Sequence, residues 1–329
     1  MYVGIDHSTT GIKVAGVGDD GELTTAFRID RRNVDTAESV LEKLDERIGL
    51  SEVSLATITY AFGDAIATVE GIEQVPNRGV TDLVGLDYGT GAGATVFDRL
   101  RDSDVPAVVL PGVHRGLDTL HEFFRHYSTL AGADKVASIR YALERFASEF
   151  GHSGTFIWVC ASSSCMAGLV CDGRLKGFFH WVGPVHGWPD PEAIRRGVES
   201  DFENVFMQCG LVPRRGDDLT EVHDISDPDL LESVYWSAIQ NVYALYPFAR
   251  ELGADGLDAV VLSGRLMRRE QPFPLGRRVY ESCLDLAPVR FAEPYTSAQG
   301  AALVAKDVAT GADHVLGIPV GDVPVDGGQ

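Results

Sequence analysis

The stretch YVGIDHSTTGIKVAGVGDDGELTTAFRI, residues 2–29, decides the fold of this chain. It begins with a short apolar run at 2–7, continues with alternating apolar and polar residues at 11–18, and then reaches Asp19-Asp20-Gly21. An Asp-Gly pair between two such stretches is typical of a β-hairpin turn. The segment therefore predicts three consecutive strands, with a polar loop between the first two.

A helix is predicted directly after these strands, over residues 35–48. Asp35 and Glu38 have the spacing of a capping box, one face is apolar, and Gly49 stands where a C-cap belongs. The other elements expected in this half are two buried strands and a long closing helix, at 55–62, 107–110 and 133–150.

The same order of elements recurs from residue 154. We expect three strands, a long helix, two further strands and a final helix, at 155–160, 165–171, 175–180, 229–252, 258–262, 289–292 and 297–310. The long helix has an apolar stripe with a spacing of three or four, at Leu231, Val234, Ala238, Val242, Leu245, Ala249 and Leu252. This repetition predicts an α/β fold of two duplicated domains, 1–150 and 151–329, with a cleft between them. We expect the last helix, at about 297–310, to pack back toward the first domain. The Gly- and Pro-rich tail after residue 311 is expected to be mobile.

The charge of the chain excludes several classes of partner. Among 329 residues, 48 Asp and Glu face 28 Lys and Arg, which gives a net charge of −20. So acidic a chain repels polyanions, and we expect it to bind neither nucleic acid nor an anionic membrane. Only five of the basic residues are lysines, at 13, 43, 135, 176 and 306. This composition favours a salt-rich cytoplasm, with an ordinary acidic enzyme as the alternative.

Localisation and redox state follow from simpler features. The first residues lack the basic and apolar regions of a signal peptide, and the longest uncharged run, 156–171, is too short to span a membrane. Five cysteines without a CxxC pair predict buried thiols rather than a disulfide framework or a zinc site. We therefore expect a cytoplasmic protein.

The first candidate site is the loop Asp6-His7-Ser8-Thr9-Thr10-Gly11-Ile12-Lys13. A turn rich in Ser, Thr and Gly offers N–H groups and hydroxyls that can wrap a phosphate. Lys13 adds positive charge in a lysine-poor chain, and Asp6 at the end of the first strand could hold a hydrated Mg²⁺. The alternative is a polar hairpin loop with an incidental lysine.

This loop resembles the first phosphate loop of the acetate kinase, sugar kinase, Hsp70 and actin superfamily, whose pattern is Asp-x-Gly-Thr/Ser-Thr-x-x-Lys. The third residue of that pattern is Ser8 here instead of Gly. The resemblance implies two duplicated actin-like (ribonuclease H-like) domains that clamp ATP between paired hairpins, so ATP and Mg²⁺ are the expected cofactors. It assigns the metal to Asp6 and the phosphates to Ser8, Thr9, Thr10, Gly11 and Lys13.

More narrowly, the chain resembles a group of archaeal proteins described as predicted butyrate kinases. The resemblance rests on GIDHSTTGIK at 4–13, NRGV at 77–80, LPGVHRG at 110–116, ADKVASI at 133–139 and GPVHG at 183–187. It implies a small carboxylic acid as substrate, and the acetate kinase branch suggests a homodimer.

A second phosphate hairpin is implied at 155–176. Its tip holds Ser162, Ser163 and Ser164, which could cradle a phosphate; a merely polar tip is the alternative. The superfamily usually places an Asp at the end of the first strand of this hairpin. That position falls at Val159 or Cys160, so a carboxylate is missing.

An adenosine contact is implied at Ser263-Gly264-Arg265. Glycine lets the backbone approach a nucleotide, and Arg265 could stack its guanidinium on the base. The alternative is an ordinary strand-to-helix turn with a surface arginine. Ala298-Gln299-Gly300 resembles the closing motif of the superfamily, and we interpret it as structural because small residues permit close packing.

The acceptor site is the least determined. A kinase that forms an acyl phosphate must neutralise a carboxylate and a phosphoryl group, for which His114, Arg115 and His186 are candidates. A hydroxyl acceptor would also need a carboxylate base, such as Asp64 or Asp87. Together with Lys13, these are the candidate catalytic residues.

We therefore expect an ATP- and Mg²⁺-dependent phosphotransferase that acts on a small, butyrate-like carboxylic acid. Two alternatives stay open. One is a kinase for a small hydroxyl substrate, which differs only in the acceptor pocket. The other is a regulatory nucleotide-binding protein that transfers no phosphate.

Overall fold

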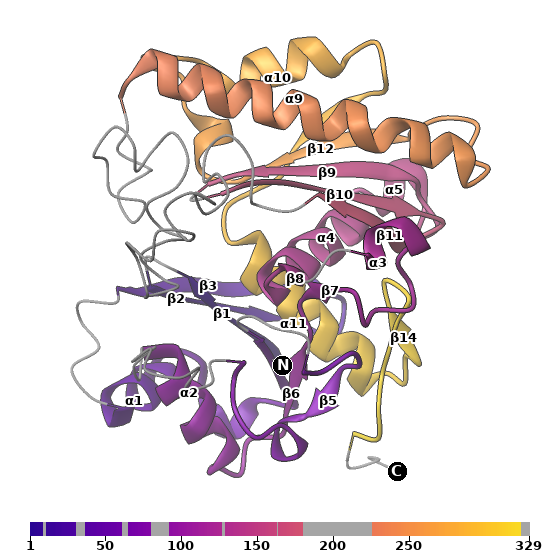
Figure 1. Cartoon of the computed structure of the whole chain (residues 1–329). Helices are drawn as coiled ribbons and strands as arrows, with labels where there is room; N and C mark the ends of the chain where they lie inside the picture. Colours follow the sequence, from indigo (N-terminus) through magenta and orange to yellow (C-terminus); the bar gives the residue numbers. More distant parts are fainter. Residues whose placement is uncertain are drawn as a thin grey trace, which may run out of the picture. The chain divides into compact units, whose positions relative to one another are not determined.

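The computed structural model describes residues 1–8, 11–30, 37–60, 65–79, 92–126, 129–162, 164–179 and 226–323. The chain divides into two units, one formed by Met1–His152 with Tyr295–Gln329 and the other by Ser153–Pro294. The chain thus leaves the first unit once and returns to it with its last helix. Figure 1 shows the elements of each unit.

A six-stranded sheet in the order β3-β2-β1-β4-β6-β5 forms the centre of the first unit. Its strands are β1 (Tyr2–Ser8), β2 (Gly11–Val17), β3 (Leu23–Asp30), β4 (Leu55–Thr59), β5 (Glu70–Gly71) and β6 (Ala107–Leu110). The first three strands are antiparallel, as residues 2–29 predict, whereas β1, β4 and β6 run parallel. β4 and β6 are buried along their whole length, which agrees with their lack of charged residues, although β4 includes two buried threonines.

Two helices from distant parts of the sequence, α4 and α11, lie against this sheet. The helices of the unit are α1 (Ala37–Ile48), α2 (Ala92–Arg101), α3 (Glu122–Arg125), α4 (Ala133–Arg145), α5 (Ala147–Phe150) and α11 (Thr296–Ala309). Gly4 on β1 makes the approach of α11 possible, because a Cβ there would lie 2.0 Å from the carbonyl oxygen of Ala298. The small residues at the start of α11 therefore fit a packing role.

The second unit repeats the hairpin-and-sheet arrangement with the strand order β11-β10-β9-β12-β13. Its strands are β9 (Phe156–Ala161), β10 (Cys165–Cys171), β11 (Arg174–Phe179), β12 (Ala259–Ser263) and β13 (Val289–Phe291). Within this unit, α9 (Pro228–Glu251) and α10 (Leu275–Cys283) lie on one side of the sheet (Figure 1).

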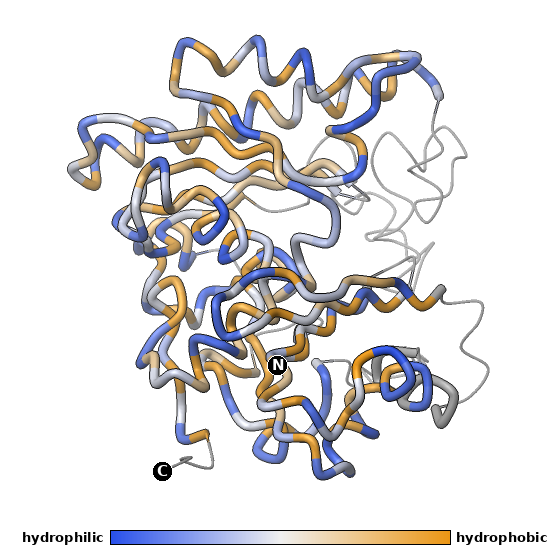
Figure 2. Tube along the Cα trace, turned by 180° about the vertical axis from the view of Figure 1, so that it is seen from behind, coloured by the Kyte–Doolittle hydropathy of each residue, from blue (hydrophilic) through white to orange (hydrophobic). Residues whose placement is uncertain are grey.

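The long helix α9 begins and packs as its sequence predicts. The side chain of Asp227 caps it by accepting a hydrogen bond from the N–H of Asp229, with Pro228 in the first turn. The predicted apolar stripe is buried from Leu231 to Ala249, and only Leu252 lies beyond the helix as its C-cap. Apolar and polar residues alternate along the helices in Figure 2.

Two predictions about local structure were wrong. The helix expected over 133–150 divides into α4 and α5, because Phe146 leaves the helical conformation at φ −109°, ψ 11°. The tail after residue 311, expected to be mobile, is folded over its described part. It forms the hairpin of β14 (His314–Val315) and β15 (Ile318–Pro319), and Val320 bridges to Val69.

The remaining short strands are β7 (Val113–His114) and β8 (Thr129–Ala131), which pair with each other in the first unit. Over the described ranges, the chain has no helix with the length and apolar character needed to cross a membrane.

Candidate functional site

The hairpin of β1 and β2 places Asp6 and Lys13 opposite each other in the first unit. The Lys13 Nζ atom lies 3.1 Å from Asp6 Oδ2. Asp6 is 0% exposed, whereas the Lys13 side chain is 28% exposed. A buried carboxylate is therefore neutralised by an ammonium group that still reaches solvent.

A second donor to Asp6 comes from α11. The Ser297 hydroxyl donates to the same Oδ2 atom at 2.5 Å, and Ser297 is itself buried. The other oxygen, Oδ1, is buried and has no hydrogen-bond partner in the described part of the chain. Leaving such an oxygen without a donor or cation costs free energy, so Oδ1 is suited to face a ligand. A hydrated Mg²⁺, which prefers carboxylate oxygens, fits this atom.

The surroundings of Asp6 keep it ionised. Burial alone would raise the pKa of Asp6, but the charge of Lys13, the hydrogen bonds from Ser297 and Lys13, and the charge of Lys135 together lower this pKa below its usual value. Lys135 lies in the first turn of α4 and forms an ion pair with Asp134. Asp6 is thus a carboxylate at neutral pH and can hold a cation.

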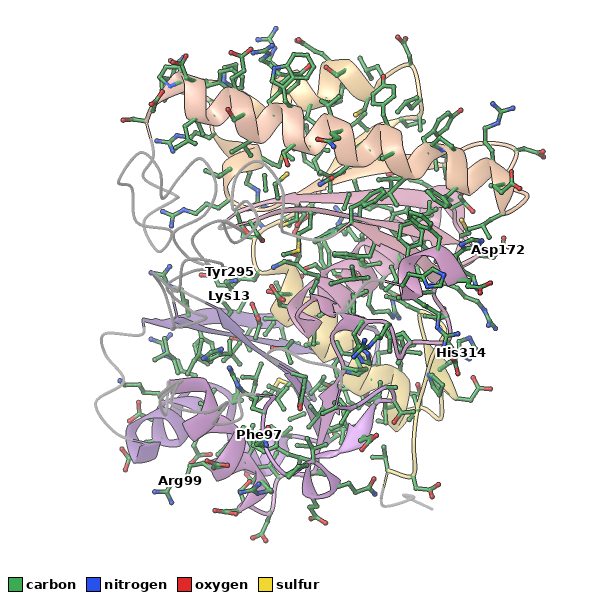
Figure 3. All side chains as sticks on the ribbon, in the orientation of Figure 1. Lys13, Phe97, Arg99, Asp172, Tyr295 and His314 are labelled. Atoms are coloured by element: carbon green, nitrogen blue, oxygen red, sulfur yellow. The ribbon has the colours of Figure 1, made fainter. Side chains whose placement is uncertain are left out.

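Neither Lys135 nor Ser297 was predicted from the sequence as a site residue. Lys135 carried a signal, because a positive side chain in the first turn of a helix opposes the helix dipole, and lysine is rare in this chain. No feature of the sequence identified Ser297 as a site residue. A serine at the start of a helix is usually a cap, but the N-cap here is Tyr295. Figure 3 shows Lys13 and Tyr295 at the same end of this unit.

The other predicted residues of the first loop are only partly described. Ser8 ends β1 opposite Gly11, which begins β2. Thr9 and Thr10 lie outside the described residues, as do Asp64, Asp87 and His186. Their roles stay predictions.

His114 and Arg115 do not share one environment. His114 is fully buried; its Nδ1 accepts the Gly116 N–H at 3.0 Å, and its Nε2 lies 2.7 Å from the carbonyl oxygen of Ile66. A carbonyl can only accept, so Nε2 carries the proton and the imidazole is neutral. These contacts give His114 a structural role in its loop. Arg115 is exposed.

In the second unit, the hairpin of β9 and β10 presents the serine tip. The Ser162 N–H donates to the carbonyl oxygen of Ser164 at 2.9 Å and closes the turn, while Ser163 lies outside the described residues. Asp6 stands two residues before the end of β1, and the matching residue of β9 is Val159, paired with Ala167 and fully buried. The predicted lack of a carboxylate at this register is therefore real.

The structure brings Gly264 against the base of the serine tip. β12 runs parallel to β9, with Ser263 beside Cys160. Gly264 has φ 99°, and a Cβ there would lie 2.2 Å from the carbonyl oxygen of Ala161. Only glycine fits this position. Arg265 follows it and is exposed, whereas Ser164 is buried. Ser162, Gly264 and Arg265 therefore form one candidate nucleotide surface.

The described cysteines are buried and free, as predicted. Burial raises the pKa of Cys165 to about 12, with a further increase from Cys160 and a decrease from a hydrogen bond with Ser237. Such a thiol is protonated at neutral pH and is a poor nucleophile. No group of three or more metal-binding side chains occurs within the described ranges.

Comparison with known proteins places the chain in a family. No protein-family model matches it. A UPF0285 protein of Methanocaldococcus jannaschii is 31% identical over 338 residues, which cover 97% of this chain and 99% of that protein. The chain belongs to the UPF0285 family. Another member, from Methanothermobacter thermautotrophicus, is 29% identical over 340 residues and covers 97% of this chain and 98% of its own length.

These UPF0285 relatives support the archaeal part of the narrower resemblance and not its activity. Both come from archaea, which agrees with the expected source, but their names give a family and no butyrate kinase activity. The butyrate kinase prediction is thus unsupported.

A solved structure identifies the fold of the UPF0285 chain. A propionate kinase of Francisella tularensis matches with a TM-score of 0.57 over 91% of this chain and 98% of that one, at 13% identity. At this identity the match shows the fold alone, which is the two-domain actin-like ATPase fold. The predicted fold class is confirmed.

Proposed function

We propose that this UPF0285 protein is an ATP-dependent phosphotransferase that uses Mg²⁺. The observation that carries the proposal is the environment of Asp6. An ionised, buried carboxylate keeps one oxygen without a partner among the described residues, and a lysine stands beside it. Mg²⁺ is usually bound through one or two carboxylates together with substrate phosphates. A lysine next to that carboxylate can offset phosphate charge.

Each residue has a distinct role in this proposal. Asp6 would hold a hydrated Mg²⁺, which when bound offsets negative charge on the phosphates. Lys13 would donate to a phosphate oxygen, and the Ser8–Gly11 loop would offer N–H groups. In the second unit, the tip at Ser162 would bind phosphate, and Gly264 would let the backbone approach the nucleotide.

The acceptor we propose is a small carboxylic acid. The fold is shared with a propionate kinase, and Lys135 adds a second ammonium group whose charge acts on Asp6. Two positive side chains suit a reaction that gathers a carboxylate and a phosphoryl group. A carboxylate is already ionised and needs no general base.

A hydroxylamine trap tests the acceptor. The protein is incubated with ATP, Mg²⁺ and hydroxylamine in the presence of acetate, propionate, butyrate or a panel of sugars. Acyl hydroxamate is expected with at least one acid, and Asp6→Asn is expected to abolish it. ADP release with a sugar and no hydroxamate with any acid would instead assign a hydroxyl acceptor.

A second candidate function has one observation in its favour. Val159 occupies the register where the first hairpin has Asp6, so the second hairpin offers no carboxylate there. This favours a nucleotide-binding protein without phosphotransfer. Binding of ATP and Mg²⁺ without turnover on any acid or sugar is the result that this candidate requires.

A further inference from the structure

The two oxygens of the Asp6 carboxylate have different surroundings. Oδ2 accepts hydrogen bonds from Lys13 at 3.1 Å and from Ser297 at 2.5 Å. Oδ1 has no partner in the described part of the chain, although it is buried. The terminal torsion of an aspartate is broad and roughly two-fold, so the carboxylate needs an anchor to keep one oxygen aimed in one direction.

Lys13 is a poor anchor once a phosphate is present. Its long stem is flexible and partly exposed, and its ammonium group can turn from Asp6 to a phosphate oxygen. Ser297 differs on each count. Its hydroxyl is one carbon from the backbone, the residue is 6% exposed, and its helix lies in direct contact with β1 at Gly4.

The backbone at the start of α11 also points to a functional constraint. Tyr295, the N-cap, adopts the left-handed conformation at φ 62°, ψ 21°. This conformation is strained for a bulky residue, and such strain is concentrated at functional sites. The chain tolerates it two residues before Ser297, at the point where it re-enters the first unit.

We infer that Ser297 is a positioning residue, which holds Asp6 Oδ2 so that Oδ1 faces the Mg²⁺–phosphate group. The inference rests on the proposed function. Ser297 touches neither metal nor nucleotide in this arrangement and acts through Asp6. Residues that orient a metal ligand in this way typically change metal affinity by about 10- to 100-fold when they are mutated.

The test measures ATP affinity by calorimetry at graded Mg²⁺ concentrations for Ser297→Ala and for a matched control, Thr296→Val. Thr296 is the neighbouring residue on α11, is similarly buried, and donates its hydroxyl to Ser138 Oγ at 3.3 Å. Its variant therefore also loses a buried hydrogen bond, but not one to Asp6. Ser297→Ala is expected to raise the Mg²⁺ concentration for half-maximal affinity by about 10-fold or more, while Thr296→Val stays near wild type.

Two further variants sharpen this result. Ser297→Thr keeps the hydroxyl and is expected to recover most of the Mg²⁺ response. If Ser297→Ala does not fold, Ser297→Cys keeps the volume with a weaker donor and is expected to give a smaller shift in the same direction. Equal shifts in the position 297 and position 296 variants, with normal wild-type binding, overturn the positioning role alone. A wild-type protein that binds no ATP overturns the proposed function and this inference together.

Discussion

The guanidinium of Arg140 forms a two-pronged ion pair with the carboxylate of Asp307, with 2.6 Å from Nε to Oδ2 and 2.9 Å from Nη2 to Oδ1. Arg140 also lies 2.9 Å from Glu144. The paired fork is the strongest geometry for such a contact. It fastens α11, the helix of Ser297, to α4, the helix of Lys135, although the two partners are 167 residues apart.

Replacement of Arg140 by methionine should destabilise the first unit. The change leaves Asp307 and Glu144 half-buried without their cation, and we expect a loss of about 3 kcal/mol in the free energy of unfolding. The matched control is Arg277→Met, which breaks an exposed pair with Glu281 and should cost less than about 1 kcal/mol. Urea denaturation measures both, and equal losses would show that the Arg140 pair does not fasten the helices.

Lys13 should affect nucleotide binding more than any other lysine. Lys13→Met removes a charged hydrogen-bond donor worth about 1.5–3 kcal/mol, so ATP affinity should fall by about 10- to 100-fold. Lys43→Met, at a half-buried position on α1, should leave ATP affinity unchanged. Calorimetric titration measures the affinity. Lys13→Met also leaves the buried Asp6 carboxylate without its ion-pair partner and should lower the free energy of unfolding. The Asp6→Asn/Lys13→Met double variant should regain that stability but not the affinity for ATP. Unchanged ATP affinity in Lys13→Met would mean that the loop is only a turn.

Gly264 should tolerate no side chain. Gly264→Ala combines positive φ with a clash against Ala161, whereas Gly253→Ala has φ 88° and open space around the new methyl. The positive φ alone costs about 1–2 kcal/mol. Gly253→Ala therefore measures the loss of stability that comes from the backbone conformation without a clash. Gly264→Ala should lose at least twice as much stability and should weaken ATP binding. If the two variants unfold at the same urea concentration, the close approach at Ala161 is absent.

The buried thiol of Cys165 makes stability depend on alkaline pH. Its pKa is about 12 in the folded chain against an ordinary 9.0. The contribution of the protonated thiol to the free energy of unfolding is therefore complete below pH 9 and is lost as pH rises toward 12. Between pH 8 and pH 10.5 this amounts to about 2 kcal/mol. From pH 8 to pH 10.5, the free energy of unfolding of Cys165→Ala should therefore fall by about 2 kcal/mol less than that of the wild type. Urea denaturation at the two pH values measures both. Identical pH dependence of the two proteins would contradict the burial of the thiol.

The sequence predicted those features that depend on local pattern. Residues 2–29 predicted the first hairpins because apolar alternation and an Asp-Gly turn act within a few residues. The apolar stripe of α9 was predicted for the same reason. The missing carboxylate was expected from the superfamily resemblance, at Val159 or Cys160, and Val159 is the residue at the matching register. The tail was missed because its hairpin depends on Leu316, a non-glycine residue at φ 53° in a two-residue turn.

Only part of the site could be predicted, because the rest comes from residues that are distant in the sequence. Asp6 and Lys13 are seven residues apart and share one motif. Ser297 reaches Asp6 across 291 residues, and no local pattern marks a serine as the partner of a distant carboxylate. His114 looked catalytic by residue type, yet its ring nitrogens bond to the backbone of Gly116 and of the distant Ile66. Only the packed structure shows that Ser297 contacts the site residue Asp6 whereas His114 contacts backbone groups.

The most direct test is a calorimetric titration of the wild-type protein with ATP in the presence of Mg²⁺. We expect saturable binding below millimolar ATP that weakens when Mg²⁺ is chelated, because Asp6 and the phosphates would share the metal. Absence of binding at millimolar ATP with Mg²⁺ present would contradict the central claim that the Asp6–Lys13 hairpin binds a nucleotide.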